Sequence, residues 1–107
     1  MKSDKRNVII LGWTTVSSKE DGQEIIRKLF DLKLISCGEI EGPITSIYTW
    51  KGELVEEMEW RITLKFPISS LQGINQKIVQ IHPYDIPQWI YREVDGSKEF
   101  TDWVSAQ

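Results

Sequence analysis

The residues from Gly42 to Phe66 are patterned as one long β-hairpin, and this feature constrains the fold more than any other. From Met58 to Phe66 every even-numbered residue is apolar and every odd-numbered one is charged or hydroxylic, which is the period-two alternation of a strand buried on one face. This stretch belongs to a longer extended run, and only Lys51 and Gly52 separate that run from the extended run that ends at Trp50. A two-residue connection with a glycine suits a tight turn. The two runs are therefore predicted to be antiparallel neighbours.

The hairpin is too long for the rest of the chain to cover. At about 3.3 Å per residue, its second strand over residues 54–66 reaches roughly 43 Å, whereas the next strand candidate, residues 8–15, reaches roughly 26 Å. The overhang would expose unpaired backbone unless another chain pairs with it. A chain of 107 residues also gains much from burial between subunits, because its surface is large for its volume. The hairpin thus predicts a homo-oligomer.

Two segments have the apolar spacing of amphipathic helices, residues 18–32 and residues 69–82. Ser17 and Glu20 have the spacing of a capping box at the start of the first helix. Pro83 stops the second helix, because proline cannot continue it.

The remaining segments complete an alternating pattern. A second strand is expected to begin within residues 34–40 and to bulge or bend at Gly42-Pro43, because proline cannot donate to a ladder. A fourth strand is expected over residues 88–94. Ser97 can cap a short last helix. The expected buried face of that helix carries Phe100, Trp103 and Val104.

The order β-α-β-β-α-β with a terminal helix predicts an α+β, ferredoxin-like sandwich, with two helices on one face of a four-stranded sheet. One domain covers residues 1–107, with residues 1–6 expected to be disordered. The other sheet face is expected to be either wet or packed against symmetry mates, and the overhang favours the second. Its expected residues are Thr45, Ile47, Thr49, Val55, Glu57, Glu59, Arg61, Thr63 and Lys65.

Charge and composition exclude several classes of partner. Thirteen basic and sixteen acidic residues give a net charge of −3, so nucleic acid and anionic lipid are not expected to bind. The apolar stretch over residues 8–13 is shorter than a signal peptide or a membrane span requires. The single cysteine, Cys37, has no partner for an internal disulfide. A reducing cytoplasm is the compartment that this predicts.

Enzyme classes find no support in the sequence. The chain has no supported Ser-His-Asp or Cys-His arrangement, no phosphate-binding glycine loop and no dinucleotide fingerprint. Acylphosphatases share the predicted fold but need an arginine and an asparagine around a phosphate, and the loop over residues 14–18 has neither. RNA-binding domains of this topology display aromatic residues where the third strand here has charges. We expect a protein that is not an enzyme.

His82 is the one histidine and the first candidate for a metal ligand. A stable copper or zinc site usually needs three or four ligands, so His82 would need carboxylates such as Asp85 or Glu59, or copies of itself from other subunits. The favoured interpretation is structural, with His82 bonding a free carbonyl at the end of a helix. Cys37, between Ile35 and Ile40, is expected to fill the core as a small hydrophobe.

A second candidate site is a cleft between subunits. Tyr48, Trp50 and Tyr84 could form its walls, with Lys65 and Glu59 supplying opposite charges for an anionic or zwitterionic small molecule. The alternative is that the aromatic rings pack the subunit interface and the two charges bridge it.

The sequence resembles the divalent-cation tolerance (CutA) family from about Val8 to Trp103. The resemblance lies in an S-x-Y-x-W-x-G motif followed by H-P-Y-x-x-P. The matching residues are Leu34-Ile35-Ser36-Cys37, Gly42 to Glu53, Glu59, Leu64-Lys65 and His82 to Pro87. Within these motifs, Cys37, Gly52, Pro83 and Pro87 are expected to be structural.

The resemblance implies a ferredoxin-like homotrimer in which the hairpin pairs with a neighbouring subunit, and a role in the response to copper and other divalent cations by binding rather than catalysis. The alternatives are a small-ligand sensor like the PII signalling proteins, or a structural or anchoring trimer. This chain lacks several potential metal ligands that family members carry. The substituted positions are Gly12, Glu39, Ile81 and Gln88.

Overall fold

The structure is a computed structural model in which residues 7–107 are described. The expectation of disorder over residues 1–6 falls outside this range. The elements are β1 (Val8–Val16), α1 (Lys19–Asp31), β2 (Cys37–Trp50), β3 (Glu53–Phe66), the short 3-10 helix η1 (Ile68–Ser70), α2 (Leu71–Ile81), β4 (Ile90–Asp95) and α3 (Lys98–Ala106). This order confirms the predicted ferredoxin-like arrangement with a terminal helix.

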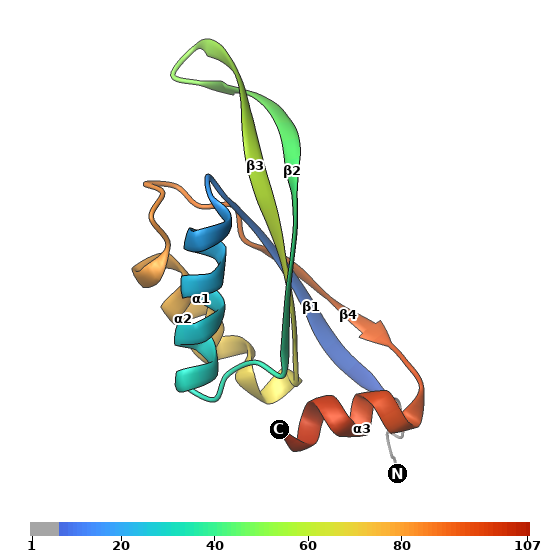
Figure 1. The fold of residues 1–107 in the computed structure, drawn as a ribbon. Coiled ribbons are helices and arrows are strands. Elements are labelled where there is room, and N and C mark those ends of the chain that lie inside the picture. The colour runs from blue at the N-terminus through green and yellow to red at the C-terminus, as the bar shows by residue number, and fades with distance from the viewer. Residues whose placement is uncertain (1–6) are drawn as a thin grey trace.

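The four strands form one antiparallel sheet in the order β2-β3-β1-β4. Helices α1 and α2 lie side by side against the sheet, and α3 lies at the end of the molecule away from the hairpin tip (Figure 1). Adjacent residues Ile9 and Ile10 of β1 are both buried, although neighbouring side chains in a strand point to opposite faces. Both faces of the sheet are therefore covered at the α3 end.

The core lies between the sheet and the pair α1 and α2. The even-numbered residues of β3 from Ile62 to Phe66 meet the apolar stripes of both helices, as their period-two and helical spacings require. The residues of this buried cluster are Ile10, Val16, Ile25, Leu29, Ile35, Ile62, Leu64, Phe66, Ile74 and Ile78. This cluster is the core of the body from which the hairpin and the connection over residues 82–89 extend.

The hairpin projects well beyond this body (Figure 1). β1 pairs with β3 only from Phe66 back to Trp60, so residues 53–59 of β3 extend past β1 by roughly 23 Å. The turn residues Lys51 and Gly52 have φ angles of 52° and 84°, and two successive positive φ angles are typical of a tight two-residue hairpin turn. The predicted overhang and its turn are confirmed.

A β-bulge in β2 changes which side chains share a face. Glu41 pairs with Arg61, whereas Ile44 pairs with Glu59. Between these two pairs β2 therefore contains one residue more than β3, at Gly42-Pro43. One extra residue moves every following side chain to the other face. The prediction that Thr45, Ile47 and Thr49 share a face with Glu57 and Glu59 is therefore wrong. That face carries Ser46, Tyr48 and Trp50 instead.

Several element boundaries differ from the prediction. Ser18 rather than Ser17 caps α1, and its hydroxyl accepts from the Asp21 amide at 3.0 Å. The second helix begins as η1 and becomes α-helical only at Leu71. The fourth strand begins at Ile90 rather than at residue 88, because residues 82–89 form an irregular connection.

The predicted face of α3 is only partly correct. Ser97 caps the helix as expected, and Val104 is fully buried, but the other buried residue is Thr101. Phe100 and Trp103 are largely exposed and stack on one another with ring centroids 5.9 Å apart. The buried face of α3 therefore consists of Thr101 and Val104, which are one helical turn apart.

Gly12 is required by close packing of Trp89 against β1. A Cβ at position 12 would overlap the Trp89 ring, whereas a Cβ at Gly73 would lie 2.9 Å from a terminal carbon of the flexible Leu34 side chain, which can shift to make room. We therefore expect Gly12→Ala to lower the free energy of unfolding by about 1–3 kcal/mol through overpacking. Urea unfolding at one fixed protein concentration measures this change.

Gly73→Ala is the matched control. It adds the same methyl group inside α2, where alanine favours the helix over glycine by about 1 kcal/mol, so we expect it to be neutral or stabilising. Equal stability of the two variants would contradict the packing of Trp89 on Gly12.

Candidate functional site

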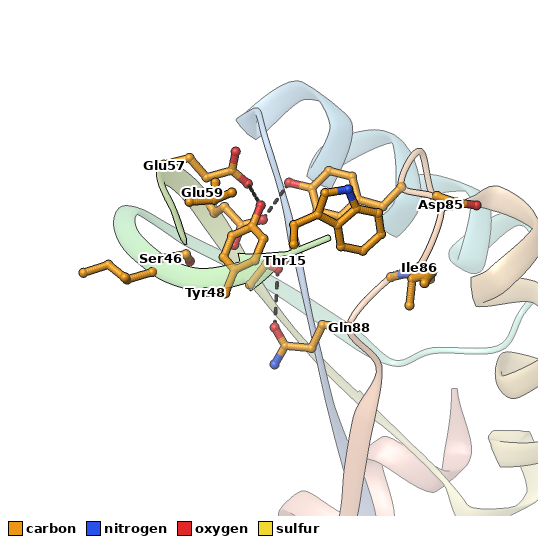
Figure 2. A pocket seen from close by; sticks show the side chains of 13 residues that line it. Thr15, Ser46, Tyr48, Glu57, Glu59, Asp85, Ile86 and Gln88 are labelled. Atoms are coloured by element: carbon orange, nitrogen blue, oxygen red, sulfur yellow. Dashed lines mark hydrogen bonds between the residues drawn. The ribbon is translucent and has the colours of Figure 1, made fainter. Parts of the chain in front are cut away.

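A pocket lies between the base of the hairpin and the connection from α2 to β4. Its volume is ≈ 810 Å³. Figure 2 shows Ser46, Tyr48, Glu57 and Glu59 gathered on one side of it and Asp85 and Ile86 across from them. The lining residues are Thr15, Ser46, Ile47, Tyr48, Trp50, Val55, Glu57, Glu59, Tyr84, Asp85, Ile86, Pro87 and Gln88.

Glu59 is held at the floor of the pocket by Tyr84. The side chain is only 5% exposed, and the Tyr84 hydroxyl donates to its Oε2 at 2.6 Å. Burial, and next the hydrogen bond to Glu59, raise the pKa of Tyr84 above its usual range. Tyr84 therefore stays protonated near neutral pH and remains a donor to the carboxylate. Glu59 is therefore already buried within one protomer, whereas the sequence left its sheet face either wet or packed against symmetry mates.

Tyr48 and Glu57 repeat this arrangement across the hairpin. The Tyr48 hydroxyl donates to Glu57 Oε1 at 2.5 Å, and this hydrogen bond is the main cause that raises the pKa of Tyr48 to about 12. The bulge makes the Tyr48–Glu57 pair possible, because it places Tyr48 on the face of the hairpin that carries Glu57 and Glu59. Two carboxylates are thus oriented by two neutral phenols.

His82 lies behind the pocket and is fully engaged by hydrogen bonds. It follows the last residue of α2 and is 7% exposed. Its Nδ1 accepts from the Tyr84 amide at 3.1 Å, which assigns the proton to Nε2. Nε2 lies 3.0 Å from the Thr15 carbonyl oxygen, to which it donates, and 2.9 Å from Thr14 Oγ1. The carbonyl that His82 bonds belongs to β1, not to the helix end as predicted.

The environment of His82 favours the neutral imidazole. Burial is the largest influence and lowers the pKa from its ordinary 6.5, while the hydrogen bond to the Thr15 carbonyl and the charges of Asp21 and Glu59 oppose it. A neutral ring with both nitrogens satisfied fixes the backbone of Tyr84. The role that this geometry supports is to position the pocket wall.

The protomer does not fit the predicted metal site at His82, Asp85 and Glu59. Both His82 nitrogens are already used, and one Glu59 oxygen accepts from Tyr84. Among residues 7–107, no group of three or more histidine, cysteine or acidic side chains is placed to hold a metal ion. Copper and zinc need such a set of donors.

Four of the five residues predicted for the cleft come together, and Lys65 does not. Tyr48, Trp50, Glu59 and Tyr84 all line the pocket. Lys65 lies six residues along β3 from Glu59, roughly 20 Å away. Its ammonium is 3.2 Å from Glu39 and 5.7 Å from the centre of the Phe100 ring.

Sequence reasoning missed the role of Glu57 and of the polar end of β1. Thr15 Oγ1 donates to Gln88 Oε1 at 3.4 Å, which links the connection over residues 82–89 to β1. The alternation of β3 places Glu57 on the same face as Glu59. Its pairing with Tyr48 can be predicted only if the register of β2 after the bulge is known. No sequence signal marks the contact of Thr15 with Gln88.

The four residues expected to be structural have different surroundings. Gly52 forms the hairpin turn, and Pro83 follows the end of α2. Pro87 lines the pocket. Cys37 is half-buried at the start of β2 and lies outside the main core cluster, so its expected place in that core is wrong.

Comparison with known proteins accounts for this architecture. The family model described as "CutA1 divalent ion tolerance protein" matches residues 10–107. The chain belongs to the CutA1 family. The divalent-cation tolerance protein CutA of Thermus thermophilus is 31% identical over 91 residues, covering 84% of this chain and 88% of the relative. That of Thermotoga maritima is 31% identical over 97 residues, covering 90% and 95%.

Solved CutA1 structures share the fold. The CutA1 structure from Ehrlichia chaffeensis superposes with a TM-score of 0.85 at 35% identity, covering 94% of each chain. That from Thermus thermophilus gives a TM-score of 0.85 at 28% identity, covering 92% of this chain and 96% of the other. These proteins are named for tolerance of divalent ions, and their names indicate no catalytic activity. In this CutA1 chain, none of the described helices is both long and apolar enough to cross a membrane.

The buried His82 makes the stability of this CutA1 protein depend on pH. Because folding lowers the pKa below its ordinary 6.5, the unfolded chain binds more protons as the pH falls through that value. The stability from His82 is full above about pH 6.5 and is lost below it, at up to about 1.4 kcal/mol per pH unit. Urea unfolding between pH 8 and pH 5 measures this slope.

His82→Gln is the matched variant, because its side-chain amide can still donate and accept hydrogen bonds but cannot titrate. We expect it to flatten the slope just below pH 6.5, whatever its stability at pH 8. An unchanged slope in the variant would show that His82 is not the buried neutral base described above.

Proposed function

We propose that this CutA1 protein acts in the cytoplasm as a homotrimer, in the response to copper and other divalent cations, and that it works by binding rather than by catalysis. The family and the names of its relatives support the divalent-cation response. The observation that carries the binding role is the pocket, in which Tyr48 and Tyr84 hold the carboxylates of Glu57 and Glu59 in fixed positions.

A small-ligand sensor is the form of this binding role that the pocket favours. A volume of ≈ 810 Å³ lies within the range of about 300–1,000 Å³ that small-molecule sites have, and it far exceeds the space of one metal ion. In this proposal the response to divalent cations runs through a ligand in the pocket, since the donors around His82 are used internally.

The projecting hairpin supports the trimer. Leu54 and Met58 are 75% and 61% exposed, on the overhang where β3 lacks a pairing partner on its β1 side among the described residues. An exposed edge with apolar residues is an aggregation hazard unless a defined neighbour covers it. Cyclic self-association covers such an edge in every copy, and three copies is the number that the resemblance implies.

Light scattering tests the trimer. We expect a mass near three times the 12.5 kDa of one chain. Met58→Asp should lower this mass by placing a charge in the interface. Val79→Asp is the control, because Val79 is equally exposed, at 60%, but lies on α2. A wild-type mass near 12.5 kDa in dilute buffer would contradict the proposal.

Growth under copper stress tests the function. In a copper-sensitive bacterial strain without its own CutA1 gene, we expect the wild-type chain to restore growth and Glu57→Gln to fail, because the variant removes one pocket charge. Glu56→Gln removes the same charge from the adjacent position of β3, on the opposite face, and should restore growth. If the wild-type chain and both variants restored growth, the pocket charge of Glu57 would not be needed for the copper response, and the proposal would be contradicted.

A further inference from the structure

We propose that the pocket of this CutA1 protein binds a small organic cation, an alkylamine in its ammonium form, between the carboxylates of Glu57 and Glu59 and the rings of Tyr48, Trp50 and Tyr84. This names the ligand class of the binding role proposed above and rests on the pocket being the binding site. It differs from the anionic or zwitterionic ligand that the sequence suggested with Lys65.

The charge of the pocket has one sign. Glu57, Glu59 and Asp85 line it, and among residues 7–107 none of those that line it is basic. Lys65, which was expected to supply a positive charge, is paired with Glu39 at the other end of β3. In the described part of one protomer, an anion would therefore find no positively charged side chain in the pocket, whereas a cation would find three carboxylates.

Glu59 carries a buried charge that is only half satisfied. Its Oε2 accepts from Tyr84, but within residues 7–107 no second donor and no basic side chain pairs with the carboxylate. Acidic residues are almost never buried to this degree without a partner. At 5% exposure, Glu59 is an uncompensated negative charge facing the pocket (Figure 2).

The walls suit an organic cation rather than a metal ion. The pocket rings are those of Tyr48, Trp50 and Tyr84, and aromatic faces attract ammonium groups within about 6 Å of the ring centre. Trp50 already does so with Lys51, whose ammonium lies 5.9 Å from the ring centre and outside the pocket lining. A metal ion would gain little from these rings and would lack a third suitably placed ligand in the described chain.

The spacing of the two carboxylates favours a diamine over a monoamine. Glu57 and Glu59 are alternate residues of β3 on one face, so they stand roughly 7 Å apart along the strand. Each has one oxygen occupied by a phenol and the other available. A short diamine can place one ammonium near each carboxylate while its methylene groups contact the rings.

Isothermal titration of the full-length protein at pH 7.5 tests the proposal. The probes are 1,4-diaminobutane and butylamine, with butyrate, butan-1-ol and copper(II) chloride as comparisons. We expect both amines to bind, the diamine more tightly, and no binding of butyrate or butan-1-ol. Glu57→Gln and Glu59→Gln should each weaken diamine binding by about tenfold or more, as loss of a charge-assisted hydrogen bond does.

Glu56→Gln is the matched control, because it changes the net charge equally from the opposite face of the strand, and it should bind the diamine within about twofold of wild type. Absence of amine binding would overturn the proposal, as would butyrate binding or copper binding that Glu57→Gln abolishes. A fall in oligomer mass on Glu57→Gln would also overturn it, since the carboxylates would then hold a cation of a neighbouring copy.

Failure of this inference and failure of the proposed function give different results. If amines do not bind but Glu57→Gln still fails to restore growth under copper stress, the pocket serves the copper response with another ligand. If amines bind and Glu57→Gln restores growth, the ligand class stands and the link to copper does not.

Discussion

The one-residue bulge at Gly42-Pro43 is the constraint on which the pocket depends. Before it, the odd-numbered residues of β2 pair with the odd-numbered residues of β3, and after it the even-numbered ones do. Without this change, Tyr48 and Trp50 would point away from Glu57 and Glu59. Gly42 permits the bulge because a Cβ there would come within 2.7 Å of the Trp60 ring.

The pocket also depends on a chain of contacts that runs from the core outward. Thr14 and Thr15 of β1 hold the His82 ring, which holds the Tyr84 amide, and the Tyr84 hydroxyl holds Glu59. The threonines, the imidazole and the phenol in this series of hydrogen bonds are neutral. The only charged group in the series is the Glu59 carboxylate at its outer end. A family named for metal ions thus uses its histidine here as a support for an acidic, aromatic pocket.

The sequence predicted the parts of this molecule that follow from periodicity and turn chemistry. Alternation over β3, the Lys51-Gly52 turn and the helical spacing of α1 and α2 all correspond to elements of the fold. The sequence also predicts the bulge, but strict alternation along β2 ignores the change of face at Gly42-Pro43 and therefore places Thr45, Ile47 and Thr49 on the wrong side. Such an error arises because a bulge reverses which residues of the following segment face each side of the sheet, while the order of residues in the sequence carries no mark of the reversal.

Other features of the site could not be derived from local pattern. Residues 82–89 follow no period, so local pattern cannot place Tyr84 or indicate that Glu59 is buried. Lys65 and Glu59 are both odd-numbered residues of β3 and so lie on the same face. The alternation does not show that they are far apart along the strand. Contacts between distant segments, such as Thr15 with Gln88, are set by tertiary packing.

The molecule is 52 Å long and about half as wide, because the hairpin projects beyond the body (Figure 1). β3 separates from β1 at Trp60, and the pocket lies close to this point, since Thr15 of β1 and Glu59 of β3 both line it. A molecule bound there would contact the hairpin and the body together, so its binding energy would be linked to the position of the hairpin relative to the body.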